Sequence, residues 1–170
     1  MPQESETRTA SADPIEVGRL VSRRYTFTTE NIRAYAEMAG DTNRLHHDLE
    51  FAKASRFGGL IASAAHSTGV LFSVAADKFA PNGEAVGLGF SLTLRRAVRA
   101  GAETDLIWKI SGRDWCGKLN GTVIEMAGEI RDINSTQTLV KAEGRMLMLN
   151  GQDSRPLLAA PPSEDPRHDK

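Results

Sequence analysis

The sequence has very little cysteine and no excess of charge of either sign. Cys116 is the only cysteine among 170 residues, so an internal disulfide cannot form and a metal site made of several thiolates is excluded. The 21 lysines and arginines nearly balance the 22 aspartates and glutamates. A balanced chain has no general attraction for a polyanion, and we therefore expect no nucleic-acid partner.

Long apolar segments are also missing. No stretch reaches the roughly 18 uninterrupted apolar residues of a membrane-spanning helix, and the polar N-terminal segment lacks the apolar centre of a secretory signal peptide. These absences favour a soluble, cytoplasmic protein that does not bind membranes. Residues 1–13 and 152–170 are rich in Pro, Ser, Ala and acidic side chains, and we expect them to form flexible tails around one domain at 14–151.

A cluster of polar side chains follows a predicted amphipathic helix. Apolar residues at i, i+3, i+4 and i+7 give that helix one buried face, namely Ile32, Tyr35, Ala36 and Ala39. Gly40 stands where a left-handed residue commonly ends a helix. Residues 41–48 then place carboxylates, an amide and two imidazoles on the connection that leaves the helix.

Asp41 and His46 are the candidate catalytic pair of this cluster. In a continuous helix they would lie about 140° apart around the axis, but a turned connection can direct both side chains into one cleft. A carboxylate can hold an imidazole in one tautomer, and the two groups can share proton transfers around one water molecule. The spacing alone favours a simpler interpretation, a solvated loop with a capping aspartate.

The rest of the chain predicts a central helix enclosed by a sheet. Ser63 can cap a helix that runs to about Phe79, and small and apolar residues are spread around its wheel, so we expect it to be buried on most sides. Alternating residues predict strands at 20–27, 86–95, 106–111, 122–132 and 138–149. The last four strands, in a meander after one apolar helix, predict an α+β fold in which an antiparallel sheet curls around the helix.

This order of elements, together with the polar motif, resembles one known family. The motif Gly-Asp-x-Asn-x-x-His-x-Asp at 40–48 is followed by Phe57-Gly58-Gly59, the apolar helix and four strands. That combination is similar to the MaoC-like, R-specific enoyl-CoA hydratase branch of the hot-dog superfamily, over about 25–149. The family signature has a proline where this sequence has Arg44, and every other element of it is kept. The resemblance implies a hot-dog fold.

The resemblance also implies an activity and the residues that perform it. The family adds water to a trans-2-enoyl thioester to give the (R)-3-hydroxyacyl form, or catalyses the reverse reaction. Asp41 and His46 would activate the water, and N–H groups at the start of the buried helix would stabilise the enolate oxygen. No metal or cofactor is implied, beyond the coenzyme A thioester that serves as substrate. The implied substrate-binding residues are Asn43, Gly59, Ser63, Ala64 and His66.

Two departures from the family pattern leave the activity open. The family commonly has His-Gly at the entry to the helix, where this sequence has Ser63-Ala64, and the Ala64 methyl group would crowd the thioester. A family serine deeper in the helix falls on Phe72. An acyl-CoA thioesterase on the same fold and a non-catalytic acyl-thioester-binding subunit are therefore alternatives. The sequence does not indicate the length of the acyl chain or the direction of the reaction. It also does not indicate whether the acyl group is carried by coenzyme A or by an acyl-carrier protein.

Three further features have both a functional and a structural interpretation. Arg95, Arg96 and Arg99 can bind coenzyme A phosphates because guanidinium suits phosphate, but charges at a strand end are usually only solvated. His66 on the buried helix fits an interior hydrogen-bonded residue better than one that reaches the cleft, and His47 is expected to be a solvated neighbour of His46. An open edge strand is a liability, and the resemblance implies that two chains pair edge to edge. We therefore expect a homodimer or a higher oligomer, with each cleft lined by both chains.

Overall fold

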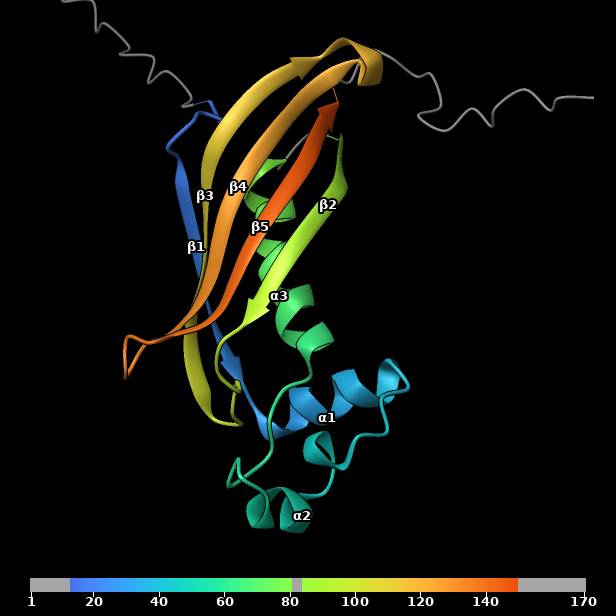
Figure 1. Ribbon diagram of the computed structural model, residues 1–170, viewed down its shortest axis with the longest axis vertical. Coiled ribbons are helices and arrows are strands. Elements are labelled where there is room, and N and C mark those ends of the chain that lie inside the picture. Colours follow the sequence, from blue (N-terminus) through green and yellow to red (C-terminus); the bar gives the residue numbers. More distant parts are fainter. Residues whose placement is uncertain (1–12, 81–83, 150–170) are drawn as a thin grey trace, which may run out of the picture.

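One antiparallel sheet and one long helix form the centre of the molecule (Figure 1). The computed structural model describes residues 13–80 and 84–149. The strands are β1 (Leu20–Phe27), β2 (Glu84–Leu94), β3 (Ala102–Cys116), β4 (Gly121–Asp132) and β5 (Thr138–Leu149). The helices are α1 (Thr29–Met38), α2 (Leu49–Ala54) and α3 (Ala64–Phe79), with short 3-10 turns at Arg44–His46 and Gly117–Leu119.

The predicted α+β arrangement, a curled antiparallel sheet packed on a long apolar helix, is confirmed. α3 lies along the sheet, and α1 and α2 lie beyond one end of it (Figure 1). Within the described ranges, no helix has the length and hydrophobicity that crossing a membrane requires. The tails expected at 1–13 and 152–170 lie outside the described residues, except for Asp13, and the domain limits of 14–151 stay a prediction.

The predicted meander of four strands is wrong for β2. The sheet order is β1-β3-β4-β5-β2, so β3, β4 and β5 form consecutive hairpins while β2 pairs with β5 at the far edge. The connection between β2 and β3 carries Val98 into the core and pairs Arg99 with Ile61. Alternating residues identify a strand because they report its two faces, but they do not report which strand lies beside it.

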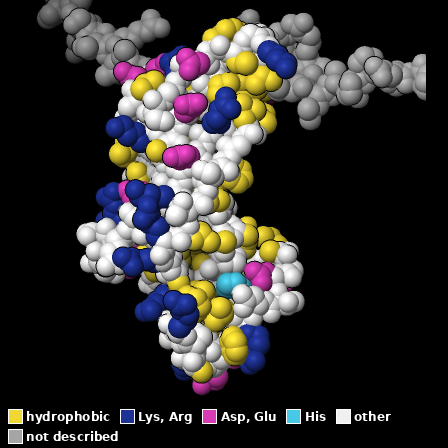
Figure 2. Space-filling model, in the orientation of Figure 1, with side chains coloured by type: hydrophobic (Ala, Val, Ile, Leu, Met, Phe, Trp, Pro, Cys, Tyr) yellow, Lys and Arg dark blue, Asp and Glu magenta, His cyan; other side chains and the backbone are white. Residues whose placement is uncertain are grey.

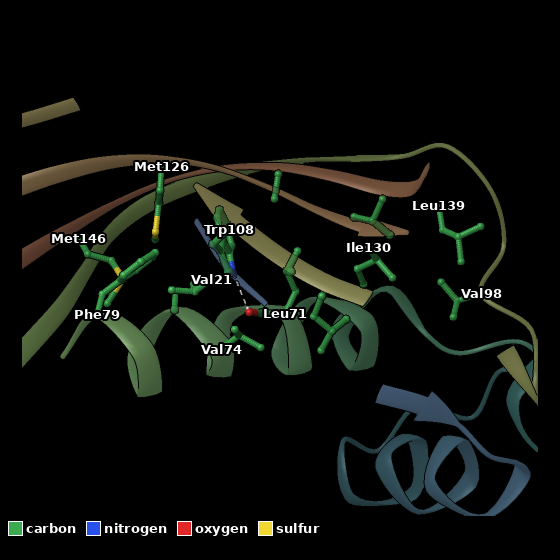
Figure 3. Packing of buried hydrophobic residues seen from close by; sticks show 14 of the residues in the cluster. Val21, Leu71, Val74, Phe79, Val98, Trp108, Met126, Ile130, Leu139 and Met146 are labelled. Carbon is green, nitrogen blue, oxygen red and sulfur yellow. Dashed lines mark hydrogen bonds between the residues drawn. The ribbon is translucent and has the colours of Figure 1, made fainter. Parts of the chain in front are cut away.

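The core lies between α3 and the sheet. Leu71, Val74, Ala75 and Phe79 of α3 are buried against sheet residues that include Trp108, Met126, Ile130 and Met146 (Figure 3). The Trp108 side chain is fully buried, and its indole N–H donates a 2.8 Å hydrogen bond to the carbonyl of Leu71. A Cβ atom on Gly128 would lie 2.5 Å from the Trp108 ring, so glycine on β4 makes room for the indole. Trp108 therefore links the helix to the centre of the sheet.

The expectation that the long helix is buried on most sides is wrong for this chain. Its sheet-facing side is buried, whereas Ala64, Ala65, Gly69, Ser73 and Ala76 are exposed. One curled sheet can cover only one side of a helix. The other side has small side chains, so composition alone made the whole helix look buried. The exposed small residues leave α3 open to close approach by another surface.

Candidate active site

The polar connection begins at a helix end that fixes the Asp41 backbone. α1 closes with Gly40 in the left-handed region, at φ 67°, as its position predicted. The Gly40 N–H donates to the Glu37 carbonyl and the Asp41 N–H donates to the Ala36 carbonyl, at 3.0 and 2.8 Å. These two bonds form a Schellman ending, which satisfies carbonyls of the last turn. Asp41 is therefore held directly against the end of α1.

Asp41 and His46 face each other across the turned connection. The distance from Asp41 Oδ2 to His46 Nε2 is 3.5 Å. The His46 residue is only 5% exposed, whereas the Asp41 side chain is about one-third exposed. The 3-10 turn Arg44–His46 brings them together, because the Asn43 side chain accepts from the Leu45 N–H and reverses the chain direction. The turned geometry that the pairing requires is therefore present.

The second ring nitrogen of His46 determines the tautomer. Nδ1 lies 2.7 Å from the carbonyl oxygen of Ile61, which can only accept a hydrogen bond. Nδ1 therefore carries a proton, and in the neutral ring the lone pair of Nε2 is directed toward Asp41. A carboxylate oxygen and an imidazole lone pair, 3.5 Å apart, are two acceptors that suit the two hydrogens of one water molecule.

Hydrogen bonds from neighbouring residues hold the Asp41 side of the pair. The Asn43 N–H donates to Asp41 Oδ1 at 3.0 Å, and the His47 Nε2–H donates to the Asp41 carbonyl at 2.5 Å. Arg33 of α1 in turn donates to the carbonyl of His47 at 3.1 Å. His47 was expected to be a solvated neighbour, but it is half-buried and braces the loop. The sequence gave no signal for this hydrogen bond, because its donor and acceptor are six residues apart on an irregular connection.

The start of α3 is linked to the pair through a short extended segment. The Ile61 N–H donates to the Leu45 carbonyl while the Ile61 carbonyl accepts from His46. Ser63 follows two residues later, is buried, and accepts from the His66 N–H as the N-cap of α3, as predicted. Ala64 is exposed as the first residue of the helix. The structure therefore brings Asp41, His46 and the α3 N-terminus into one region.

The other residues assigned to substrate binding have different surroundings. Asn43 is exposed and structures the loop through its own side chain. Gly59 is half-buried, and a Cβ atom added to it would meet no atom within 4 Å. The left-handed residue of that bend is Gly58, at φ 70°. Their assignment to substrate binding stays a prediction.

His66 lies inside an enclosure of aromatic rings. Its ring stacks on Tyr35 at a centroid distance of 4.6 Å, meets Phe27 edge-on, and has Nε2 3.1 Å from the Tyr25 hydroxyl. Only 2% of the residue is exposed, and burial lowers the pKa of the imidazole. Nδ1 has no hydrogen-bond partner within the described residues. These contacts place His66 in the protein interior, and a role in binding substrate is a prediction that they do not support.

No metal cluster is present in this region. Among residues 13–80 and 84–149, no three His, Cys, Asp or Glu side chains gather in a way that could hold a metal ion.

Comparison with known proteins identifies the family. The sequence model of the MaoC-like domain matches residues 11–128. This chain belongs to the MaoC-like domain family. No curated protein matches the MaoC-like chain in sequence.

Solved structures confirm the hot-dog fold of the MaoC-like chain. The unliganded R-hydratase PhaJ1 from Pseudomonas aeruginosa is 21% identical, with a TM-score of 0.67 and coverage of 79% of this chain and 82% of that one. The (R)-hydratase of A. caviae involved in PHA biosynthesis is 20% identical, with a TM-score of 0.69 and coverage of 77% and 95%. The ChsH1–ChsH2 complex from Mycobacterium tuberculosis is 17% identical, with a TM-score of 0.68 and coverage of 78% and 98%.

Proposed function

We propose that this MaoC-like protein adds water to trans-2-enoyl-CoA thioesters to give (R)-3-hydroxyacyl-CoA, or catalyses the reverse dehydration. The observation that carries the proposal is the pair of acceptors formed by Asp41 Oδ2 and His46 Nε2, 3.5 Å apart, with the His46 tautomer set by Ile61. Membership in the MaoC-like family, and likeness to structures named as R-hydratases, support the same reaction class.

The pair can activate one water molecule without a metal. One acceptor takes a proton as the water oxygen attacks C3 of the enoyl group, and the π electrons move toward C2 and the thioester oxygen. The proton, relayed across the pair, is then delivered to C2. N–H groups at the first turn of α3 stabilise the negative charge on the thioester oxygen, assisted by the helix dipole. Dehydration follows the same steps in reverse.

The Ser63-Ala64 sequence supports one alternative, a non-catalytic acyl-thioester-binding subunit. The Ser63 hydroxyl is occupied as the helix cap, so it is not free to replace the imidazole that the family has there. The Ala64 methyl group stands at the helix entry where the thioester would approach. The second alternative is another enzyme, a thioesterase in which Asp41 promotes attack of water on the thioester carbonyl.

A single assay distinguishes these functions. Purified protein is incubated with crotonyl-CoA while the enoyl absorbance and free thiol are followed together, and the product is analysed for its configuration. Loss of enoyl absorbance with no thiol released, and formation of the (R)-3-hydroxy product, is the expected result. Release of thiol would favour the thioesterase. Neither signal, across a panel of acyl chain lengths, would favour the binding subunit.

We also propose a homodimer that pairs through β2. β2 is an edge strand, and it exposes a row of large apolar residues, Val86, Leu88 and Phe90, the last of them 60% exposed. An edge with unpaired backbone groups and apolar side chains invites pairing with another strand. The small residues on the exposed side of α3 would also allow a second chain to approach closely. One similar structure is itself a complex, that of ChsH1 with ChsH2.

The dimer predicts that a charge on β2 will separate the chains. Leu88→Glu should convert a two-chain particle into single chains at micromolar concentration, because a carboxylate on the paired edge would be desolvated or face its own copy. Light scattering or sedimentation measures the mass. If each cleft is lined by both chains, this variant should lose activity together with its dimer.

Leu20→Glu is the matched control for this prediction. Leu20 is also exposed and apolar, but it lies on β1, at the opposite edge of the sheet. It should leave the mass unchanged. A wild-type protein that is monodisperse as a single chain and fully active would contradict both the dimer and the shared cleft.

A further inference from the structure

Nine of the twelve arginines in the described residues fall into two groups by their partners. Of the other three, Arg23 and Arg33 donate hydrogen bonds to backbone carbonyls, and Arg19 has a buried Nε. Five of the nine are paired with carboxylates, in the ion pairs Arg24–Asp105, Arg44–Asp48, Arg113–Asp13, Arg131–Glu129 and Arg145–Glu125. Four others are exposed, and within residues 13–80 and 84–149 their guanidinium groups have no hydrogen bond or ion pair; these are Arg56, Arg95, Arg96 and Arg99. Unpaired guanidinium groups are available to bind an anion.

The four unpaired arginines line one hollow of about 570 Å³. Arg56 comes from the bend after α2, and the other three come from the end of β2 and the connection to β3. The lining has one carboxylate, Asp132, whose Oδ1 accepts from the N–H and hydroxyl of Ser135. Those bonds lower the pKa of Asp132, so the group is charged but already engaged. Four positive groups against one engaged carboxylate leave the hollow strongly positive.

The charge of the hollow stands out against the rest of the molecule. The whole chain has a net charge of −1, so the excess of positive groups is local. Lysine and arginine side chains gather over the lower half of the face that Figure 2 shows, toward α2. Like charges held close together repel one another, and a bound polyanion relieves that repulsion.

The hollow adjoins the Asp41–His46 pair through one segment of chain. Arg99 forms an antiparallel bridge with Ile61, and the Ala62 N–H donates to the Val98 carbonyl at 2.8 Å. The carbonyl of the same Ile61 accepts from His46. The segment around Ile61 therefore has the catalytic pair on one side and the arginine-bearing connection on the other. A ligand with its anionic part in the hollow would have its far end near the pair.

We infer that this arginine hollow binds the 3′-phosphoadenosine diphosphate of coenzyme A. This inference rests on the proposed hydratase function, and it selects coenzyme A over an acyl-carrier protein as the carrier of the acyl group. The nucleotide has three phosphates, and each guanidinium can form paired hydrogen bonds to phosphate oxygens. Phe57, half-buried in the lining, has the Arg56 guanidinium over its ring at 5.8 Å from the centroid, so an aromatic ring and a cation are available together for the adenine and its phosphates. The pantetheine arm then spans from the hollow to the pair.

A concave site is the geometric reason for preferring the nucleotide. An acidic carrier protein would require a broad basic surface, whereas these side chains surround a hollow that suits a small ligand. The sequence alone brought Arg95, Arg96 and Arg99 together as neighbours. Arg56 and Phe57, about 40 positions earlier, join them only in the folded chain.

The test uses one double variant and a control with the same change of charge. Arg96→Gln/Arg99→Gln removes two guanidiniums from the hollow, while Arg24→Gln/Arg145→Gln removes two that are paired elsewhere on the sheet. Calorimetry measures binding of adenosine 3′,5′-bisphosphate, and kinetics compare crotonyl-CoA with crotonyl-pantetheine, which lacks the nucleotide. Nucleotide binding is measured without turnover, so it tests the hollow even if the protein is not a hydratase.

The hollow variant should bind adenosine 3′,5′-bisphosphate at least about tenfold more weakly than wild type, because each lost charged hydrogen bond is worth a factor of this size. Its KM for crotonyl-CoA should rise by a similar factor with kcat nearly unchanged, and its KM for crotonyl-pantetheine should not change. The control variant should behave as wild type. Equal nucleotide binding in both variants would overturn the inference. So would a defect of the hollow variant confined to crotonyl-acyl-carrier protein, which would assign the arginines to docking of that protein.

Discussion

Asp41→Asn and His46→Gln should each lower kcat/KM for crotonyl-CoA by about 10²–10⁴-fold, the usual contribution of a positioned acid or base. Asparagine keeps the volume of Asp41 and can still accept from the Asn43 N–H, but it cannot hold a proton taken from water. Glutamine at position 46 keeps an N–H donor for the Ile61 carbonyl and removes the Nε2 lone pair. Steady-state kinetics on both variants measure the effect, and thermal unfolding checks that the fold is intact.

Asp48→Asn is the matched control within the same polar motif. Asp48 caps α2 by accepting from the Phe51 N–H and pairs with Arg44, and asparagine caps a helix about as well as aspartate. Its activity should stay close to that of wild type. The double variant Asp41→Asn/His46→Gln should be no slower than the worse single variant, because the two groups act on one water. If either single variant retained more than about a third of the wild-type rate, that residue would not be catalytic.

Trp108→Ala should lower the free energy of unfolding by about 3–5 kcal/mol, the usual cost of removing a fully buried large aromatic side chain. The indole fills the space between α3 and β4, packs against Phe72, and donates to the Leu71 carbonyl, which would lose its side-chain partner. Urea unfolding at one fixed protein concentration measures the change, since a dimer makes stability depend on concentration. Trp115→Ala is the control, because Trp115 lies on the same strand but is 57% exposed.

Gly128 supplies a second test of the same packing. Gly128→Ala places a methyl group 2.5 Å from the Trp108 ring and should cost about 1–3 kcal/mol, as overpacked core substitutions do. In a Trp108→Leu background the ring is gone, and the same glycine change should cost much less. Simple addition of the two single effects would show that Gly128 is required for some other reason.

Local sequence determined the ends of the elements and the position of the polar motif. Gly40 ends α1 and Ser63 starts α3, because each acts within a few residues of the helix end through a backbone conformation or one capping bond. Alternating residues located the strands for the same reason, since side chains on a strand report two faces. The motif at 40–48, through its resemblance to the MaoC-like family, indicated Asp41 and His46 as a pair before any distance was known.

Tertiary structure decided everything that depends on contacts between distant segments. β2 lies beside β5 and not beside β3. The alternation of residues along β2 cannot predict this, because β2 would have the same buried face and the same exposed face beside either strand. Only the folded chain places the Ile61 carbonyl on His46 and so sets its tautomer, and only the fold adds Arg56 to the arginines after β2. The exposed side of α3 is a third case: its small residues read as buried, but one curled sheet covers one side of a helix and leaves the other open.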